Sequence, residues 1–594
     1  MKRFLALLLI IVTGSLAYAD NSKLAPELQN YNGSQPVQVI VQYAPGTQLN
    51  CSGLLGLVDC VLNDIVNLGG KVLGQLPLIN GLVAQLDGNG IQSLSNQSNV
   101  VYISTDRPLT PTDVNGDGAI NAAFAWQSNY VGSGVGVALI DSGVGNNADL
   151  DRGILPLSRV VYQQSFVPGN SSTNDQYGHG THVAGLIAGD GLNSTGILYN
   201  QTFKGVAPGA NIVNLRVLDE NGEGTDSLVI AAINKAISLK SAYNIRVINL
   251  SLGRAVYETY KLDPLCQAVE QAWKNGIVVV VAAGNNGRYQ PTDGYATVTS
   301  PGNDPYVITV GAMKPMGTPT RTDDLIASYS SKGPTVVDAV VKPDVVAPGN
   351  LLISLAVPNS TLYSEFPANQ VPYSYYVNGG SSASSTSYFT LSGTSMAAGM
   401  VSGVVADLLQ KSSNLTPDQV KARLMLTAYK TFPATSSTTD PTTGITYTDQ
   451  YDVFTVGAGY VDVEAALNST AMAKGTAMSP IATFNANTNE VYMSDDPSAV
   501  WNTSSTWSNT AVWGASQFIS GTSAVSSGTS SSSSALSSNN ALWGSNALWG
   551  SNALWGSNAL WGSNALWGSN ALWGSNALWG SNALWGSNVS QGEQ

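Results

Sequence analysis

The chain has 594 residues, a formal net charge of −13 and only 11% charged residues. This length is too great for one ordinary hydrophobic core, so the chain is expected to divide into several segments. An acidic chain without basic clusters also lacks the electrostatic surface that nucleic acids require, which excludes nucleic acid as a partner.

Residues 1–19 have the pattern of a secretory signal peptide. Lys2 and Arg3 precede an apolar run from Phe4 to Val12, and Ala17-Tyr18-Ala19 places small residues where a signal peptidase cuts. A membrane anchor is the alternative interpretation, but the apolar run is too short to cross a bilayer. The sequence therefore predicts a secreted, extracellular protein.

Residues 20–110 are predicted to form a small α+β unit. Val37–Tyr43 alternates like a strand, and Cys51–Leu73 is apolar at helical spacing. Leu82–Leu86 and Val100–Ser104 are further predicted strands. The unit contains no histidine and no converging pair of acids, so it is not predicted to be catalytic.

The three cysteines do not form a zinc-binding pattern. In an exported protein, Cys51 and Cys60 could close a small disulfide loop. Cys266 could be a reactive nucleophile, but it lies in an apolar-periodic stretch without a nearby histidine. A buried structural thiol is the favoured interpretation.

Residues 113–468 alternate apolar, β-branched strands with longer helical stretches. The predicted strands are Gly136–Ile140, Ile212–Val217, Arg246–Leu250, Ile277–Ala282 and Val307–Val310, and the predicted helices include Ser227–Ser238 and Leu265–Asn275. Near-continuous apolar strands joined by helical crossovers predict a doubly wound, mostly parallel α/β sheet with helices on both faces.

The only two histidines of the chain, His179 and His182, lie together in the segment Gly178–Gly185. A spacing of three on a helix places both side chains on one face, as a metal pair would need. However, no acidic partner or third ligand lies nearby in the sequence. The alternative is one catalytic base beside a structural neighbour.

Three further polar residues lie where strands end or helices begin. Asp141 ends a buried parallel strand, where open α/β sheets place ligands. Ser395 precedes an apolar helical stretch, and a helix N-terminus favours developing negative charge. Asn285 follows an apolar strand, where its amide can donate to an oxyanion. Each residue alone has a plainer interpretation as a turn or cap residue.

Taken together and in their order along the chain, the segments around these residues resemble the signature motifs of the subtilase superfamily of serine peptidases. Val137–Val144 resembles the aspartate motif, His179–Gly185 the histidine motif and Gly393–Ala397 the serine motif. Val247–Gly253 resembles the strand that lines the substrate cleft, and Ala282–Asn285 resembles the oxyanion motif. The order Asp, His, Ser is also that of the family. The resemblance covers the central segment, roughly 60% of the chain.

The resemblance implies a serine-type endopeptidase that works through an acyl-enzyme. Ser395 would be the nucleophile, His179 the general base and Asp141 the group that orients the imidazole. The Asn285 amide and the Ser395 backbone N–H would bind the oxyanion. His182 would then be structural.

The resemblance also assigns the residues that line the substrate cleft. Ser251, Leu252, Gly253, Ala283 and Gly284 would line the cleft and the first specificity pocket, with the first three pairing with a polypeptide substrate as an added strand. No acidic cluster lies near these segments, so broad specificity is expected. A narrow processing protease and a surface adhesin with an inactive protease domain are the alternatives.

The family further implies that residues 20–110 are an inhibitory propeptide of ferredoxin-like fold, cut somewhere in Thr105–Thr112. No cofactor is expected for the chemistry, but structural calcium is common in the family. Asp149 resembles one calcium ligand position, although Gly191–Lys204 lacks the usual ligand pattern. Asp113–Gly118 resembles the start of a calcium loop, but Phe124 stands where that loop needs an acid.

The C-terminal part has biased composition. Residues 469–540 are predicted to be a Ser/Thr/Gly-rich linker region, with a flexible stretch from Gly521 to Asn540. Residues 541–588 repeat the hexapeptide Asn-Ala-Leu-Trp-Gly-Ser. Tryptophan ladders between stacked strands, a disordered tail, self-association and attachment to the cell surface all remain open for this repeat.

Overall fold

The computed structural model describes most of the chain between residues 20 and 537. The described residues are 20–24, 28–29, 31–44, 46–47, 61–76, 80–105, 118–152, 155–440, 443–485, 490–501, 504–513, 518–519, 522–523, 526–527, 533–537 and 593. The predicted signal peptide, Cys51, Cys60, residues 106–112 and the hexapeptide repeats lie outside them. None of the helices in the described ranges combines the length and the apolar character that a membrane crossing requires.

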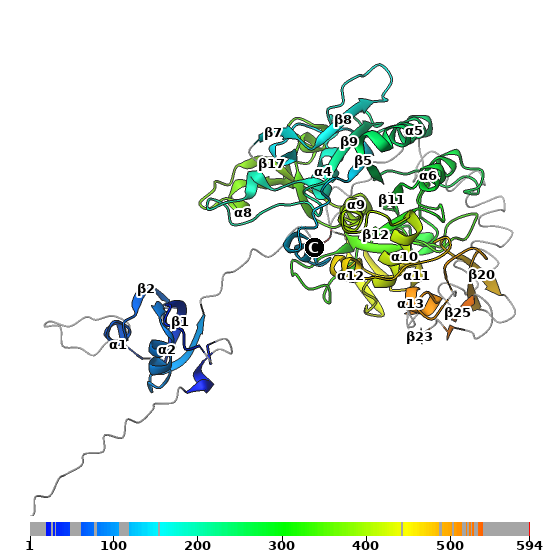
Figure 1. The fold of residues 1–594 in the computed structure, drawn as a ribbon. Coiled ribbons are helices and arrows are strands. Elements are labelled where there is room, and N and C mark those ends of the chain that lie inside the picture. The colour runs from blue at the N-terminus through cyan, green and yellow to red at the C-terminus, as the bar shows by residue number, and fades with distance from the viewer. Residues whose placement is uncertain are drawn as a thin grey trace, which may run out of the picture. The chain divides into compact units, whose positions relative to one another are not determined.

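The chain divides into two compact units, Met1–Thr110 and Pro111–Gln594 (Figure 1). The first unit contains, in chain order, β1 (Val37–Tyr43), α1 (Val61–Asn67), β2 (Lys71–Leu76), β3 (Gly81–Leu86), α2 (Gly88–Ser95) and β4 (Val100–Thr105). The strands form an antiparallel sheet in the order β2-β3-β1-β4. This βαββαβ arrangement is a ferredoxin-like topology. All three strands predicted in this unit are present.

The helix predicted over Cys51–Leu73 is wrong at its C-terminal end. The helix α1 ends at Asn67, and Lys71–Leu73 belong to β2. Gly69 adopts φ +78°, a left-handed conformation that ends a helix and favours glycine. After this turn Val72 pairs with Ala84 of β3, so sheet pairing overrides the apolar helical spacing.

The core of the second unit is an eight-stranded sheet with the strand order β13-β12-β11-β10-β5-β9-β8, and β14 pairs with β12. Every pairing is parallel except β12 with β13. The strands are β5 (Gly136–Asp141), β8 (Val160–Ser165), β9 (Asn211–Arg216), β10 (Ile245–Leu250), β11 (Val278–Ala282), β12 (Ile308–Lys314), β13 (Leu325–Ile326) and β14 (Val345–Pro348). The five predicted strands are confirmed, and each observed strand begins within one residue of its predicted start.

Helices pack against this sheet. The helices α4 (His179–Ala188) and α9 (Thr394–Lys411) contact each other, and α9 lies against β10, β11, β12 and β14. The helices α5 (Asp226–Tyr243) and α6 (Pro264–Lys274) contact each other and pack on β5, β9, β10 and β11, on the side of the sheet away from α9 (Figure 1). The predicted doubly wound α/β architecture is confirmed for this unit.

Smaller elements surround the sheet. They are α3 (Ala122–Gln127), β6 (Asp151–Arg152), β7 (Leu155–Ser158), β15 (Leu352–Leu355), α7 (Thr361–Glu365), β16 (Gln370–Pro372), α8 (Tyr373–Tyr376), β17 (Ser384–Leu391), α10 (Pro417–Thr427), β18 (Thr435–Thr439), β19 (Thr446–Gln450), α11 (Val453–Val456) and α12 (Val463–Asn468). The strands β15, β17 and β16 form a separate sheet that positions His182, as described below.

The linker predicted for residues 469–540 is wrong for much of that range. The strands β20 (Ile481–Asn485), β21 (Glu490–Ser494), β25 (Ser533–Ser537) and β24 (Ser526–Ser527) form one antiparallel sheet, α13 covers Asn509–Trp513, and β22 (Phe518–Ile519) pairs with β23 (Thr522–Ser523). Trp501 and Trp513 are buried in the main hydrophobic core. The Ser/Thr-rich composition did not predict these elements, because a few large apolar side chains and backbone strand pairing are enough to stabilise the segment.

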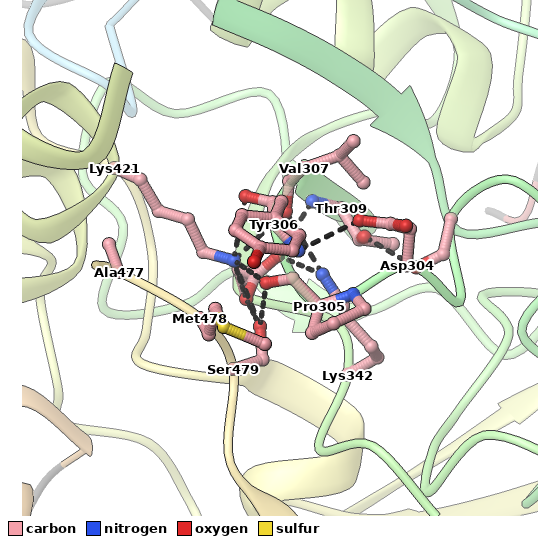
Figure 2. A network of polar contacts seen from close by, with 12 residues as sticks. Asp304, Pro305, Tyr306, Val307, Thr309, Lys342, Lys421, Ala477, Met478 and Ser479 are labelled. Atoms are coloured by element: carbon pink, nitrogen blue, oxygen red, sulfur yellow. Dashed lines mark hydrogen bonds and ion pairs between the residues drawn. The ribbon is translucent and has the colours of Figure 1, made fainter. Parts of the chain in front are cut away.

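A buried ion network joins this C-terminal segment to the sheet (Figure 2). Asp344 Oδ2 lies 2.7 Å from Lys342 Nζ, and Asp344 Oδ1 lies 3.1 Å from Lys421 Nζ on α10. Lys421 also donates to Ser479 Oγ at 2.9 Å and to carbonyls of residues 305–307. Burial alone would raise the pKa of Asp344, but the two lysines and the hydrogen bonds outweigh it and hold that pKa below its ordinary value. Ser479 thereby ties the C-terminal segment to the strand-end loops.

Candidate active site

Asp141 and His179 form a buried pair between β5 and α4. The last residue of β5 is Asp141, and the first residue of α4 is His179. Asp141 Oδ1 lies 2.8 Å from His179 Nδ1, and both side chains are fully buried. A carboxylate can only accept a hydrogen bond, so Nδ1 holds the ring proton and Nε2 presents a lone pair. Within the described residues His179 Nε2 has no hydrogen-bond partner.

The pair also sets the basicity of the imidazole. Burial lowers the pKa of His179, but the charge and the hydrogen bond of Asp141 outweigh burial and raise that pKa above its ordinary value of 6.5. Asp175 adds a smaller effect in the same direction. The result is a base that is stronger than free histidine and oriented by a carboxylate.

Sequence reasoning missed Asp175, which holds the start of α4 in place. Its buried carboxylate accepts from the backbone N–H groups of Gly178 (2.7 Å) and Thr181 (2.8 Å). It also accepts from Ser142 Oγ at 2.8 Å, and Ser142 N donates to Asp141 Oδ1 at 2.7 Å. Asp175 therefore connects the start of α4, which carries His179, to Ser142, which holds Asp141. The signal that could have identified it is an aspartate four residues before His179, since a helix starting there needs acceptors for its free N–H groups.

Ser395 lies in the first turn of α9, after Gly393. It is buried, and its hydroxyl donates to the carbonyl of Ser251 at 3.1 Å. Ser251 Oγ in turn donates to the Ser395 carbonyl at 2.8 Å. The helix that carries Ser395 in its first turn, α9, packs directly on α4, which begins with His179. In this state the Ser395 hydroxyl bonds to Ser251.

Asn285 follows β11 and is anchored by the residue before Ser395. Its amide oxygen accepts from the Thr394 backbone N–H at 2.9 Å and from Thr394 Oγ1 at 3.0 Å. Since both partners are donors, the atom at that position must be the oxygen, and the amide nitrogen is the group that can donate elsewhere. Thr394 Oγ1 also accepts from the Gly284 N–H at 3.1 Å, which ties the turn after β11 to α9.

Comparison with known proteins agrees with this arrangement. The sequence pattern described as the subtilase family matches residues 132–459, which is more than half of the chain. This chain belongs to the subtilase family. It is similar to serine protease AprX of Bacillus subtilis, with 35% identity over 60% of this chain and 75% of the relative. It is also similar to subtilisin E of the same species, with 34% identity over 61% and 78%. The match to alkaline serine exoprotease A of Vibrio alginolyticus is 32% identical over 58% and 55%. This subtilase is therefore a subtilisin-like serine-type endopeptidase.

The predicted pocket residues of this subtilase follow β10 and β11. Ser251, Leu252 and Ala283 are buried at the ends of these adjacent parallel strands. Gly284 adopts φ +106°, and a Cβ there would lie 2.9 Å from Thr299 Cγ2, so backbone conformation and space both require glycine. A Cβ on Gly253 would lie 2.5 Å from Thr299 Oγ1. The structure brings all five predicted residues to one edge of the sheet.

His182 has a structural environment. Its Nε2 lies 3.1 Å from the carbonyl of Leu352 and 3.1 Å from that of Phe389, which are on β15 and β17. Burial and the neighbouring His179 lower its pKa to about 3, so the ring is neutral. A neutral ring whose Nε2–H is donated to carbonyls has no lone pair there for a metal. The second interpretation of the histidine pair, one base beside a structural neighbour, therefore fits the geometry.

Asp149 is held by donors of the protein. Its Oδ1 accepts from the Asn193 N–H at 2.6 Å, and its Oδ2 accepts from Tyr388 Oη at 2.6 Å. Burial raises the pKa of Asp149 to about 6. A calcium ion needs oxygen atoms that are free to face it, whereas both carboxylate oxygens of Asp149 accept from protein donors. These contacts do not fit a calcium ion at Asp149.

Cys266 is a buried thiol on α6, as the sequence predicts. It is unpaired and fully buried, with Sγ 3.3 Å from Asn303 Oδ1. Burial and the nearby Asp304 carboxylate raise its pKa. A thiol with these properties is not a nucleophile at neutral pH.

Proposed function

We propose that this subtilase is an exported endopeptidase whose catalytic triad is Asp141, His179 and Ser395. The observation that best supports the proposal is the buried 2.8 Å pair between Asp141 and His179, which leaves the His179 Nε2 lone pair unpartnered among the described groups. Ser395 lies in the first turn of the helix that packs on the His179 helix. Hydroxyl, imidazole and carboxylate are thus supplied by three adjoining elements.

The first half of the reaction forms an acyl-enzyme. The Ser395 hydroxyl leaves its bond to the Ser251 carbonyl and donates instead to His179 Nε2. As Oγ attacks the scissile carbonyl carbon, its proton passes to Nε2, and Asp141 stabilises the imidazolium. The negative charge moves to the carbonyl oxygen, where the Asn285 amide and the Ser395 backbone N–H donate to it. The C–N bond then breaks, and Nε2–H protonates the leaving amine.

The second half repeats these steps with water. Water gives a proton to His179 Nε2 and attacks the ester carbonyl, and the same two donors bind the second oxyanion. The C–Oγ bond breaks, and the proton returns to Ser395.

We propose a broad substrate range. Ser251, Leu252 and Gly253 would pair with the backbone of an extended substrate, a mode of recognition that reads no particular side chain. The residues that would form the pocket walls, Ala283, Gly284 and the adjacent Thr299, are neutral. A pocket without a fixed charge does not select a charged substrate side chain.

The N-terminal segments support maturation and export. We propose that residues 20–110 act as an inhibitory propeptide, because they lie in a compact unit of their own that has a ferredoxin-like topology and its own buried core. The signal-peptide pattern in residues 1–19 supports an extracellular destination.

The test of this function is hydrolysis of casein by the purified protein. Ser395→Ala should abolish activity beyond a residual background and prevent release of residues 20–110, as followed by intact mass. Ser413→Ala, an exposed serine beyond the end of α9, is the matched control and should retain full activity. A serine-directed sulfonyl fluoride should inactivate the wild type with one equivalent bound. Casein hydrolysis that persists in Ser395→Ala would refute the assignment.

A further inference from the structure

Glu593, close to the end of the sequence, is bound in a buried site on the second unit. Its side chain is fully buried and forms an ion pair with Arg288 at 2.7 Å. The backbone N–H of Ser328 donates to both of its carboxylate oxygens, at 3.0 and 3.2 Å, and Ser328 Oγ donates to Oε1. Lys314 adds a further positive charge that attracts the carboxylate. The site therefore satisfies a negative charge with a cation and with two neutral donors.

The main chain of Glu593 is recognised as well. Asn350 Oδ1 accepts from the Glu593 N–H at 2.9 Å, and Asn350 Nδ2 donates to the Glu593 carbonyl at 2.7 Å. One amide thus pairs with both backbone groups of one residue, as a neighbouring strand would. Asn350 and Ser328 are themselves buried. Recognition of both side chain and backbone is typical of a peptide-binding site and is not expected of a chance surface contact.

The site is organised by groups other than Glu593. Arg288 also pairs with Asp440 at 3.0 Å, donates through Nε to Ser328 Oγ at 2.9 Å, and lies over the rings of Tyr329 and Tyr447. These contacts hold the guanidinium in one orientation, which reduces the entropy lost when a carboxylate binds. Without that carboxylate, the buried Ser328 N–H would lose its partner.

The site lies beside the turn that holds the proposed oxyanion donor. Arg288 is three residues after Asn285, and Asn286 N donates to Ser331 Oγ in the same loop pair. On the other side, the Gly349 carbonyl next to Asn350 accepts from the Gly393 N–H at 2.8 Å, just before Ser395. A segment bound to both Arg288 and Asn350 therefore connects the loop that carries Asn285 to the loop that contacts the start of α9 before Ser395.

We propose that Arg288, Ser328 and Asn350 form a docking site for an acidic peptide segment, and that its occupant is the segment around Glu593 of the same chain. Arg288 complements the charge of Glu593, Asn350 pairs with its main chain, and the Glu593 side chain is buried in the site. Docking would hold the segment that follows the tryptophan repeats on the peptidase unit. This inference does not depend on the proposed hydrolytic activity.

The test uses the full chain with Ser395→Ala, which removes self-cleavage without touching the docking site. A fluorescently labelled peptide spanning residues 588–594 is titrated by anisotropy. The peptide should bind the Ser395→Ala/Glu593→Ala chain at least tenfold more tightly than the Ser395→Ala chain, whose own Glu593 fills the site. A peptide with Gln in place of Glu593 should bind at least tenfold more weakly, and so should the wild-type peptide to a chain that also carries Arg288→Met.

Hydrogen exchange provides a second measurement that does not rely on Arg288→Met remaining folded. The Ser328 amide should exchange at least tenfold faster when Glu593→Ala is added to Ser395→Ala. Equal peptide binding by both chains, or an unchanged Ser328 exchange rate, would overturn the proposal. Light scattering that shows a concentration-dependent dimer, lost with Glu593→Ala, would overturn the assignment to the same chain and indicate a second copy as the occupant.

Discussion

Replacing Thr394 by valine is expected to lower kcat with little change in KM. In the structure, Thr394 Oγ1 donates to Asn285 Oδ1 at 3.0 Å and accepts from Gly284 N at 3.1 Å. The Thr394 backbone N–H holds the same Asn285 oxygen at 2.9 Å, so valine removes one of two anchors and keeps the other. The Asn285 amide should then spend less time aligned with the oxyanion, which exists only in the transition state.

The size of the effect follows from the bonds that are lost. Valine removes two bonds of the Thr394 hydroxyl, and the one to Asn285 bears directly on the orientation of the amide. One neutral hydrogen bond contributes about 1 kcal/mol, which corresponds to roughly a fivefold change in kcat. Asn285→Ala removes the donor itself and should cost about 100- to 1,000-fold, the range found for the oxyanion-hole asparagine of subtilisin. Thr394→Ser keeps the hydroxyl and should stay within about twofold of the wild type.

The assay is steady-state hydrolysis of a chromogenic peptide by Thr394→Val, Asn285→Ala and the double variant. Because Thr394 acts through Asn285, Thr394→Val should change kcat by less than about twofold when Asn285 is already alanine. A fivefold loss in both backgrounds would refute the reasoning, since Thr394 would then act by another route. A rise in KM alone would also contradict it.

Three other predictions concern the charge on His179, the buried ion network and Cys266. Asp141→Asn removes the charge that raises the His179 pKa, and only neutral His179 is a base. The acid limb of the kcat/KM profile, which is expected above pH 6.5 in the wild type, should therefore move to lower pH, and kcat should fall about 10⁴-fold. An acid limb that does not move would contradict the pairing of Asp141 with His179. Lys421→Met removes one of the two cations beside the buried Asp344 and one donor to the carbonyls of residues 305–307, so urea unfolding in the Ser395→Ala background should show a free energy of unfolding lower by about 3–5 kcal/mol. The folded state lowers the pKa of Asp344, so this carboxylate contributes stability that is fully present above pH 3.8, its ordinary pKa, and is lost as the pH falls further. Lys421→Met should therefore lose less stability than the wild type on acidification. Cys266, in a Cys51→Ser/Cys60→Ser chain, should react with a disulfide reagent at least about 100-fold more slowly when folded than in guanidinium, and equal rates would show that the thiol is exposed.

The elements that sequence reasoning located best are those whose side chains are buried on both faces. The strands β5, β9, β10, β11 and β12 are short runs rich in β-branched and apolar residues, which is typical of buried parallel strands in a long α/β pattern. The prediction was wrong for the C-terminal end of the helix in Cys51–Leu73 and for much of residues 469–540. Apolar residues at helical spacing did not show that Lys71 and Val72 pair with β3, and polar composition did not show that β21 pairs with β25.

The amino-acid sequence alone determined the architecture of the sheet and the residue types Asp141, His179, Ser395 and Asn285 at its strand ends and helix starts. It did so because burial and helix-terminus chemistry act over a few neighbouring residues. Only the tertiary structure decided that Thr394 orients Asn285, that Asp175 links Ser142 to the start of α4, and that Glu593 meets Arg288. These contacts join positions up to 305 residues apart, and their bonds depend on distances that no local pattern encodes.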